Sequence, residues 1–268
     1  MVSKLLLCCF LAFVTGNSIP VESDIDDEYD DPVLNFDDPI LKIVGGSVAS
    51  RGQFPWQLHL RRNGAFTCGA VLISSTRALT AAHCLSSGTY TATAGEHSPS
   101  TTSGNEVTRT VSSWTRHPSY TSGSGYPNDI AILRFSSSFP STTYIQTITM
   151  ASSTSSDFTG VTCTISGWGR TSGGGSTAST LRYANMPAIS NSECASRWSS
   201  ISGAAINSGH ICVYQSGKSA CSGDSGGPMV CSGILAGITS WGISSCSGGY
   251  PSVYSRVSYF RNWINSNL

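Results

Sequence analysis

The rhythm of short apolar segments after residue 42 constrains the fold more than any other feature. Stretches rich in Gly, Ser or Asn, such as "RNGA", "TSGSGYPN" and "TSGGGST", separate these segments. Short apolar runs bounded by turn residues are typical of strands, and many in succession predict an all-β sandwich or barrel. The low share of charged residues, 11%, agrees with strands joined by turns rather than long helices. The runs cover residues 56–60, 70–73, 130–135, 161–165, 229–230 and 234–238.

The C-terminus follows a different period. Val257, Phe260, Ile264 and Leu268 recur at spacings of three and four residues. This spacing places all four side chains on one face of a helix. The sequence therefore predicts an amphipathic helix at the end of an otherwise β-rich chain.

The first sixteen residues have the pattern of a secretory signal peptide. Lys4 supplies a positive start, residues 5–14 are apolar, and Thr15-Gly16 form a small-residue exit. A membrane anchor is the alternative, but a run of about ten residues is too short to span a bilayer. We therefore expect a signal peptide over 1–16, a secreted extracellular protein and no membrane contact.

Ten cysteines divide between the signal peptide and the remaining chain. Cys8 and Cys9 leave with the signal, and an even number remains. In a secreted chain this predicts four disulfides, although eight cysteines allow about a hundred pairings. No CxxC pair occurs, so we expect no zinc site. The remaining cysteines are Cys68, Cys84, Cys163, Cys194, Cys212, Cys221, Cys231 and Cys246.

Charge is distributed unevenly along the chain. Nine acidic residues lie between Pro20 and Leu41, whereas residues 43–268 carry six acids against thirteen bases. An acidic, proline-interrupted segment of this kind is expected to be mobile and to screen a basic body. The arginines are scattered and no basic stretch exceeds two residues. We therefore expect no nucleic-acid partner.

Three motifs carry the residue types that amide hydrolysis by a hydroxyl requires. They are "LTAAHC" with His83, "NDIAIL" with Asp129 and "GDSGGP" with Ser225. Such a reaction needs a base, a group that orients the base, and N–H donors for the oxyanion. Each motif alone has a structural explanation. Together, in a secreted β-rich chain, they indicate a nucleophilic hydrolase.

From Ile43 to Leu268 the chain resembles the chymotrypsin-like serine endopeptidases. The matching segments are "IVGG", "PWQ", "TAAHC", "NDIAIL", "SGWG", "CSGDSGGP" and "SWG", in the order of that family. The resemblance implies two packed antiparallel six-stranded β-barrels, with halves near 43–150 and 151–268. It also implies the disulfides Cys68–Cys84, Cys163–Cys231, Cys194–Cys212 and Cys221–Cys246.

The resemblance assigns catalytic roles residue by residue. His83 becomes the general base, Asp129 orients its imidazole, and Ser225 attacks the carbonyl carbon. The N–H groups of Gly223 and Ser225 form the oxyanion hole. A catalytically inactive homologue is the alternative, but such relatives usually lack one of the three catalytic residues, and all three are present here.

The same resemblance implies activation by proteolysis. Cleavage after Lys42 would release an acidic propeptide over 17–42 and free the amino group of Ile43. That ammonium would pair with Asp224, because a buried carboxylate left without a partner is costly.

Substrate preference is expected to depend on residues that map to the pocket of the family. Ser219 stands where a trypsin-like enzyme carries Asp, so the pocket base is neutral, and desolvating an unpaired Lys or Arg there is expensive. Gly242 leaves the entrance open, and Ser252 replaces the usual Gly and narrows the depth. The backbone of residues 240–242 (Ser240, Trp241, Gly242) would bind the substrate chain. We expect cleavage after Leu, Met, Phe or Tyr, with an elastase-like preference as the alternative.

An enzyme with this preference would not cut efficiently after its own Lys42, so a separate trypsin-like protease is the expected activator. A digestive endopeptidase is the leading hypothesis, and a regulatory protease is the other. Expected partners are protein and peptide substrates and protein protease inhibitors, and we expect a monomer.

No cofactor is required. Glu96 and Glu106 match a calcium-binding loop of the family in spacing, but Ser103 replaces an expected acid between them. A solvated loop is therefore the favoured interpretation.

Overall fold

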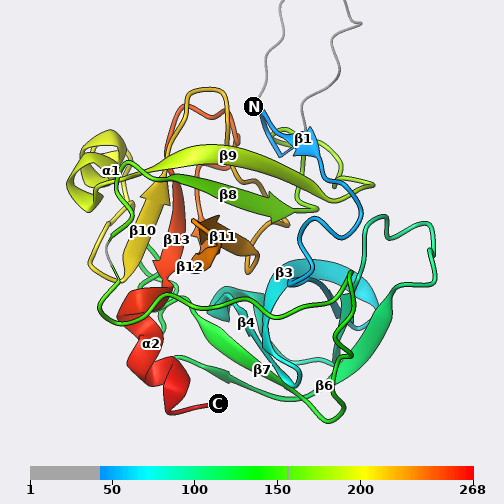
Figure 1. The fold of residues 1–268 in the computed structure, drawn as a ribbon. Helices are drawn as coiled ribbons and strands as arrows, with labels where there is room; N and C mark the ends of the chain where they lie inside the picture. Colours follow the sequence, from blue (N-terminus) through cyan, green and yellow to red (C-terminus); the bar gives the residue numbers. More distant parts are fainter. Residues whose placement is uncertain (1–42, 156) are drawn as a thin grey trace, which may run out of the picture. The chain divides into compact units, whose positions relative to one another are not determined.

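The computed structural model describes residues 43–155 and 157–268. The predicted signal peptide and propeptide lie outside these residues. The elements, drawn in Figure 1, are β1 (Ser47–Val48), β2 (Gln57–Arg62), β3 (Ala65–Ser74), β4 (Arg77–Thr80), η1 (Ala82–Cys84), β5 (Tyr90–Ala94), β6 (Val107–Arg116), β7 (Ala131–Phe135), β8 (Thr162–Gly167), β9 (Arg182–Ile189), α1 (Asn191–Trp198), β10 (His210–Val213), β11 (Pro228–Cys231), β12 (Ile234–Trp241), β13 (Ser252–Arg256) and α2 (Val257–Asn265).

The first barrel is built by the strands from β2 to β7. They close in the order β2-β3-β4-β7-β6-β5, and every pairing is antiparallel. Leu58, Leu60 and Leu72 are buried in its core. Small residues such as Ala92 and Ala94 on β5 also point inward, which leaves room for the larger side chains of the opposite strands.

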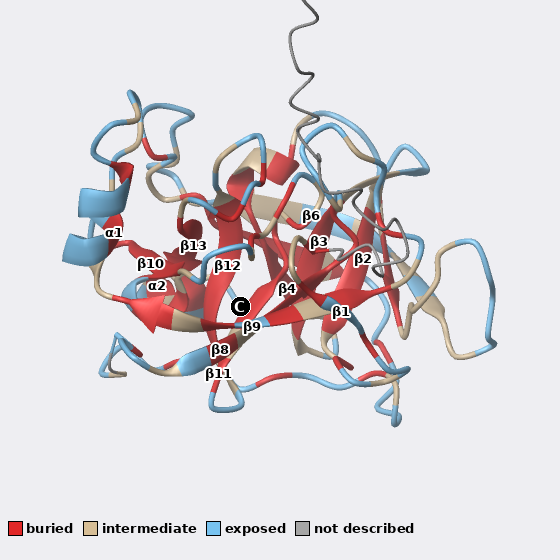
Figure 2. Ribbon diagram, turned by 90° about the horizontal axis from the view of Figure 1, so that it is seen from above, coloured by how far each residue is buried: buried red, intermediate tan, exposed pale blue. Residues whose placement is uncertain are grey.

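The second barrel contains the strands from β8 to β13. Because β9 pairs with both β10 and β8, this sheet also closes on itself, and β1 pairs with β9 outside the ring. Met186, Met229, Leu235 and Tyr254 are completely buried in it. The predicted fold class, two six-stranded antiparallel barrels, is therefore confirmed. Figure 2 shows the strands mostly buried and the connecting loops mostly exposed.

The predicted C-terminal helix is present as α2. Val257, Phe260 and Ile264 are buried and face β12, as their spacing requires. The prediction for Leu268 was wrong, because the helix ends at Asn265 and the Leu268 side chain is 53% exposed. Ser266 donates back to Asn262 and closes the last turn, so the helical period stops before Leu268.

Helix α1 was not predicted from the apolar pattern. Ser190 caps its N-terminus by accepting a hydrogen bond from the Glu193 amide. The sequence holds this signal, since Ser followed three residues later by Glu matches a capping box. Cys194 and Trp198 are its buried residues, and the outward face is exposed (Figure 2).

Four disulfides join the pairs Cys68–Cys84, Cys163–Cys231, Cys194–Cys212 and Cys221–Cys246. These are the pairs that the family resemblance implied. Within the described residues, no helix is both long and apolar enough to cross a bilayer.

Candidate active site

His83 and Asp129 are in direct contact. His83 lies in the short turn η1, and its Nδ1 is 2.7 Å from Asp129 Oδ2. The His83 backbone N–H donates to the other carboxylate oxygen at 2.9 Å. Asp129 therefore fixes both the ring and the backbone of His83, and its own side chain is fully buried.

Asp129 is also held by two serines of the second barrel. Ser240, on β12, donates to Oδ2 at 2.5 Å, and Ser255, on β13, donates to the Asp129 carbonyl at 2.6 Å. The pairing of β12 with β13 shifts register between Thr239 and Trp241, so Ser240 has no partner in the ladder. This bulge frees its hydroxyl for Asp129. The carboxylate thus lies where the two barrels meet.

Ser225 lies on a tight loop between Cys221 and β11. Its carbonyl accepts from the Gly69 amide of the first barrel, while its hydroxyl bonds to no other described residue. Gly223 has φ +100, a conformation that L side chains rarely adopt. Within residues 43–155 and 157–268, neither the Gly223 nor the Ser225 N–H donates to another residue. Two neighbouring donors are therefore left free beside an unbonded hydroxyl.

Asp224 points in the opposite direction, into the protein. Its two oxygens accept from the amides of Gly169 and Cys221 at 2.8 and 2.9 Å. Burial raises the pKa of this carboxyl to about 6, although both hydrogen bonds oppose the change. No ion pair among the described residues involves Asp224. Ile43, the first described residue, is itself buried.

A pocket of about 270 Å³ joins these groups. His83 and Ser225 line it together, and none of its lining residues is Asp, Glu, Lys or Arg. Gly242 lies on its wall, and a Cβ built there would meet nothing within 4 Å. The predicted residues His83, Ser225, Ser240, Trp241 and Gly242 are thus brought to one cavity.

Ser219 and Ser252, which were expected in the specificity pocket, are not among its lining residues. Both are 1% exposed, and their hydroxyl oxygens are 3.4 Å apart. Ser219 donates to the Ala220 carbonyl, and the Ala220 amide donates to Ser252. The two small neutral side chains therefore bond mainly to each other and to Ala220, which does line the pocket. Val44 pairs with Ser219 and so links the start of the described chain to these two serines.

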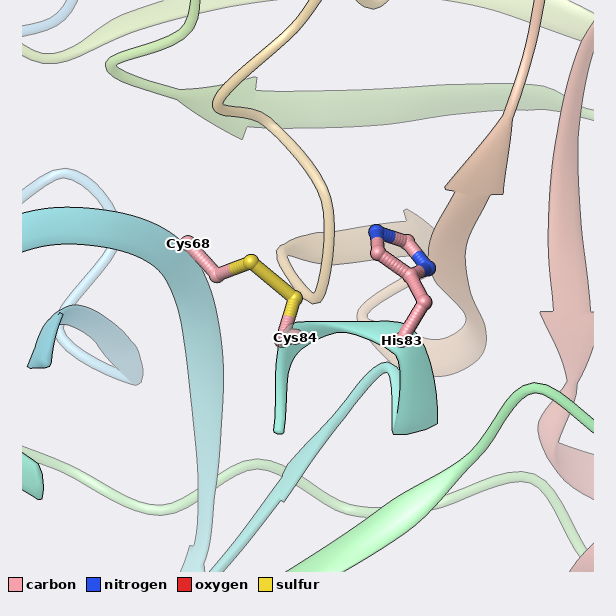
Figure 3. Close-up of side chains that lie close together, drawn as sticks. All are labelled: Cys68, His83 and Cys84. Carbon is pink, nitrogen blue, oxygen red and sulfur yellow. A yellow bond between two sulfur atoms is a disulfide. The ribbon is translucent and has the colours of Figure 1, made fainter. Parts of the chain in front are cut away.

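The described residues bring one set of potential metal-ligand side chains together. Cys68, His83 and Cys84 have ligand atoms within 4.8 Å of one another. However, the two sulfurs are bonded in a disulfide and offer no thiolate. Figure 3 shows the imidazole and the disulfide projecting from opposite ends of the η1 turn.

Glu96 and Glu106 lie close enough to interact. Burial raises the pKa of Glu96, and the charge of Glu106 adds to this. Burial opposes ionisation of Glu106 too, but hydrogen bonds from Ser103 and Gly104 outweigh it and lower its pKa. Ser103, the departure from the calcium-loop pattern, thus closes the loop on Glu106 through both its amide and its hydroxyl.

Two functional groups of this site are not indicated by the sequence motifs: the Tyr126 ring and the Ser240 hydroxyl. Tyr126 lines the pocket, and its ring lies edge-on to His83 with centroids 6.0 Å apart. Its position three residues before Asp129 was the available signal, but the turn-like stretch around it suggested only a loop. Ser240 was assigned to the substrate backbone, and nothing in its strand pattern indicated a bond to Asp129.

Comparison with known proteins matches this arrangement. A model of the trypsin family fits residues 43–264. A chymotrypsin-like serine proteinase of Haliotis rufescens is 46% identical over 243 aligned residues, covering 84% of this chain and 91% of the relative. The fibrinolytic enzyme isozyme C of Lumbricus rubellus is 39% identical, with coverages of 84% and 99%. Trypsin delta of Drosophila melanogaster is 40% identical, with coverages of 84% and 88%. The chain therefore belongs to the trypsin family of chymotrypsin-like serine proteases.

Proposed function

We propose that this serine endopeptidase is secreted as a zymogen, is activated by cleavage after Lys42, and hydrolyses peptide bonds after medium to large apolar residues. The observation that carries the preference is the uncharged pocket beside His83 and Ser225. Its neutral base, Ser219, and its open wall at Gly242 add support. Digestion of dietary protein is the role we favour.

The proposed reaction follows from the roles of three side chains. His83 takes the proton of the Ser225 hydroxyl as that oxygen attacks the carbonyl carbon, and later gives it to the leaving nitrogen. Asp129, bonded to His83 Nδ1, stabilises the imidazolium. The free N–H groups of Gly223 and Ser225 stabilise the oxyanion, and one such donor is typically worth about 10²–10³ in kcat.

The preference follows from the energetics of desolvation. Burying a Phe or Leu side chain in an apolar pocket gains roughly 1.5–3 kcal/mol. A Lys or Arg side chain in the same place would lose its hydration and find no carboxylate, because Ser219 replaces one. An elastase-like preference is the second candidate, supported by the Ser252 side chain, which accepts from the amide of Ala220 on the pocket lining.

Activation would complete the environment of Asp224. Among residues 43–155 and 157–268, its buried carboxylate is bonded only by backbone amides. A free ammonium at Ile43 would supply the missing positive charge and stabilise the loop that carries Gly223 and Ser225. The specificity of the pocket predicts that this cut is made by another, trypsin-like protease.

The deciding experiment activates the purified precursor with trace trypsin, inhibits the trypsin selectively, and measures kcat/KM on peptides that differ only before the cut bond. We expect Phe, Tyr, Leu and Met to exceed Ala and Val, and all to exceed Lys and Arg. The Ser225→Ala variant is the control for residual activator. Efficient cleavage after Arg contradicts the specificity, and failure of wild type to react with a serine-directed inhibitor contradicts the enzyme itself. Rapid activation without added protease contradicts the separate activator.

A further inference from the structure

Exposed large hydrophobic side chains are few in the described chain. They are Val48, Tyr126, Tyr259 and Leu268. Val48 is held in β1, Tyr259 in α2, and Leu268 is the last residue. Tyr126 alone among them lies in an irregular loop, between β6 and β7, with 38% of its surface exposed.

The residue that follows Tyr126 is Pro127. Tyr120, in the same loop, and Tyr144, in the next one, are followed by Thr and Ile instead. Both of these rings are only partly exposed and pack against the core of the first barrel. Tyr126 is thus the most accessible aromatic residue in a loop of the described chain, and a proline follows it. Phe54, Phe139 and Tyr250 also precede prolines, but their side chains are less exposed.

Exposure of Tyr126 is a consequence of its place at the active site. Its ring lines the pocket beside His83, where a substrate must enter. A buried aromatic could not form that wall. The same residue is of the class that the proposed pocket accepts, so each molecule presents a potential cleavage site to the next one.

The folded loop is the first protection of this bond. Tyr126 has φ +47 and its amide donates to the Gly123 carbonyl, in a tight turn that does not fit an extended substrate conformation. The Gly125 amide donates to the Gly203 carbonyl, and the Thr121 amide donates to the Pro127 carbonyl. Proteolysis proceeds from states in which such a loop has opened locally. In those states protection depends on the bond itself.

Cleavage of this bond would need three changes at its atoms. Ser225 Oγ would bond to the Tyr126 carbonyl carbon, the C–N bond would break, and the nitrogen of residue 127 would take the proton from His83 and leave. Water would then hydrolyse the ester. A proline nitrogen carries Cδ in place of hydrogen, and its ring fills the space beside the nitrogen that His83 must approach.

We propose that Pro127 makes the bond after Tyr126 resistant to the protein's own peptidase activity, which lets an aromatic residue stand exposed beside the catalytic centre. The proposal rests on the proposed preference for apolar residues. A cut here would separate the chain three residues before Asp129, whose carboxylate holds His83. Self-cleavage at this bond would therefore also be self-inactivation.

The test compares activated wild type with Pro127→Ala, Pro118→Ala and the double variant Tyr126→Ser/Pro127→Ala. Pro118 is the matched control, because it lies in the same loop but follows a histidine. Each protein is incubated at high concentration, and its fragments are identified by mass and N-terminal sequencing. We expect Pro127→Ala to accumulate a fragment beginning at residue 127 and to lose intact chain about tenfold faster, equivalent to about 1.4 kcal/mol of barrier. Its activity falls in parallel, Pro118→Ala fragments no faster than wild type, and the double variant keeps the bond between residues 126 and 127 intact.

Two outcomes overturn the proposal. One is a Pro127→Ala protein that stays as intact as wild type while hydrolysing Tyr-containing peptides. The other is equal fragmentation of Pro118→Ala or of the double variant, because loss of loop stability would then be the cause.

A second arm separates this proposal from the proposed function. Inert Ser225→Ala chains with and without Pro127→Ala are exposed to an added protease of established aromatic preference. Cleavage after Tyr126 in the Pro127→Ala chain alone supports protection by the proline, and equal resistance or equal cleavage contradicts it. Inability of the activated wild type to cut aromatic peptides counts against the proposed function instead.

Discussion

Two regions of this protein bury a carboxylate, and they satisfy it in different ways. Asp129 accepts from the His83 ring, the His83 amide and the Ser240 hydroxyl. Asp224 accepts from two backbone amides, and burial raises its pKa to about 6. The first region is complete once the barrels have folded. The second holds a charge that lacks a counter-ion among the described residues, and so it can respond to a new positive group.

The largest expected effect on catalysis comes from substituting Asp129, the carboxylate whose partners are all present in the folded barrels. Asp129→Asn keeps the size of the side chain but favours the wrong tautomer of His83, so kcat should fall about 10⁴-fold. Steady-state kinetics with active-site titration measure it. An unchanged circular dichroism spectrum serves as the control for folding. A loss below about tenfold would remove Asp129 from the proposed mechanism.

The next largest effect is expected at Asp224, once activation has freed the Ile43 ammonium. Asp224→Asn leaves the ammonium of Ile43 without its partner, and breaking a buried ion pair costs about 3–5 kcal/mol. The activated variant should therefore lose about 10²–10³-fold in kcat/KM. Recovery of activity at high concentrations of an Ile-Val dipeptide in wild-type precursor, but not in Asp224→Asn, would sharpen the assignment. Normal activity of the variant speaks against the ion pair.

In the uncut chain the same carboxylate has the opposite effect on stability. Because its folded pKa lies above the unfolded one, the folded state loses stability as pH rises from about 4 to about 6 and the group ionises. The loss is roughly 3 kcal/mol for a shift of this size. Chemical unfolding of the Lys42→Gln precursor against pH measures it. The Lys42→Gln/Asp224→Asn protein should lack this decline, and equal slopes for the two would contradict the comparison.

A smaller effect on activity is expected from removing the Ser240 hydroxyl, one of the donors to Asp129. Ser240→Ala removes a hydrogen bond to a charged group, which is typically worth about 1.5–3 kcal/mol. Because His83 still donates twice to Asp129, we expect a fall of about tenfold in kcat/KM. The pH profile of kcat/KM reports whether the change acts through His83. Ser240→Thr should retain more activity than Ser240→Ala if the hydroxyl is responsible.

The smallest effect belongs to an exposed carboxylate. Glu193 pairs with Arg197 one turn later on α1, with both side chains well exposed. Pairs of this kind contribute about 0.3–0.5 kcal/mol. Arg197→Ala should therefore shift the unfolding free energy by no more than this, apart from the loss of its contact with the Tyr214 ring. A larger fall in unfolding free energy that shrinks at high salt would mean that this exposed ion pair contributes strongly. Burial would then not explain why Asp129 and Asp224 have larger effects than Glu193.

Strand periodicity, a local property, predicted a β-rich chain but left a sandwich or a barrel open. The resemblance to the chymotrypsin-like family implied the two barrels and the residues of the pocket. The apolar pattern missed α1, where a capping signal was present but the apolar period was short. It placed Leu268 on the helix because spacing does not say where the last turn closes. The role of the Ser240 hydroxyl depends on a bulge and on contact between the two barrels, and neither is visible in the order of residues along β12. The exposure of Tyr126 is likewise a tertiary property.

The bulge at Ser240 bears on how this scaffold could be altered. Before it, β12 pairs with β11 and β13, and after it Trp241 and Gly242 line the pocket. A bulge re-aims the residues beside it, so the change of direction at Ser240 divides the barrel part of the strand from the pocket part. Exchanges that begin at Trp241 should redirect substrate choice and leave the barrel intact. Exchanges that include Ser240 would also disturb the carboxylate on which the chemistry depends. Segments exchanged to alter substrate choice should therefore begin after Ser240.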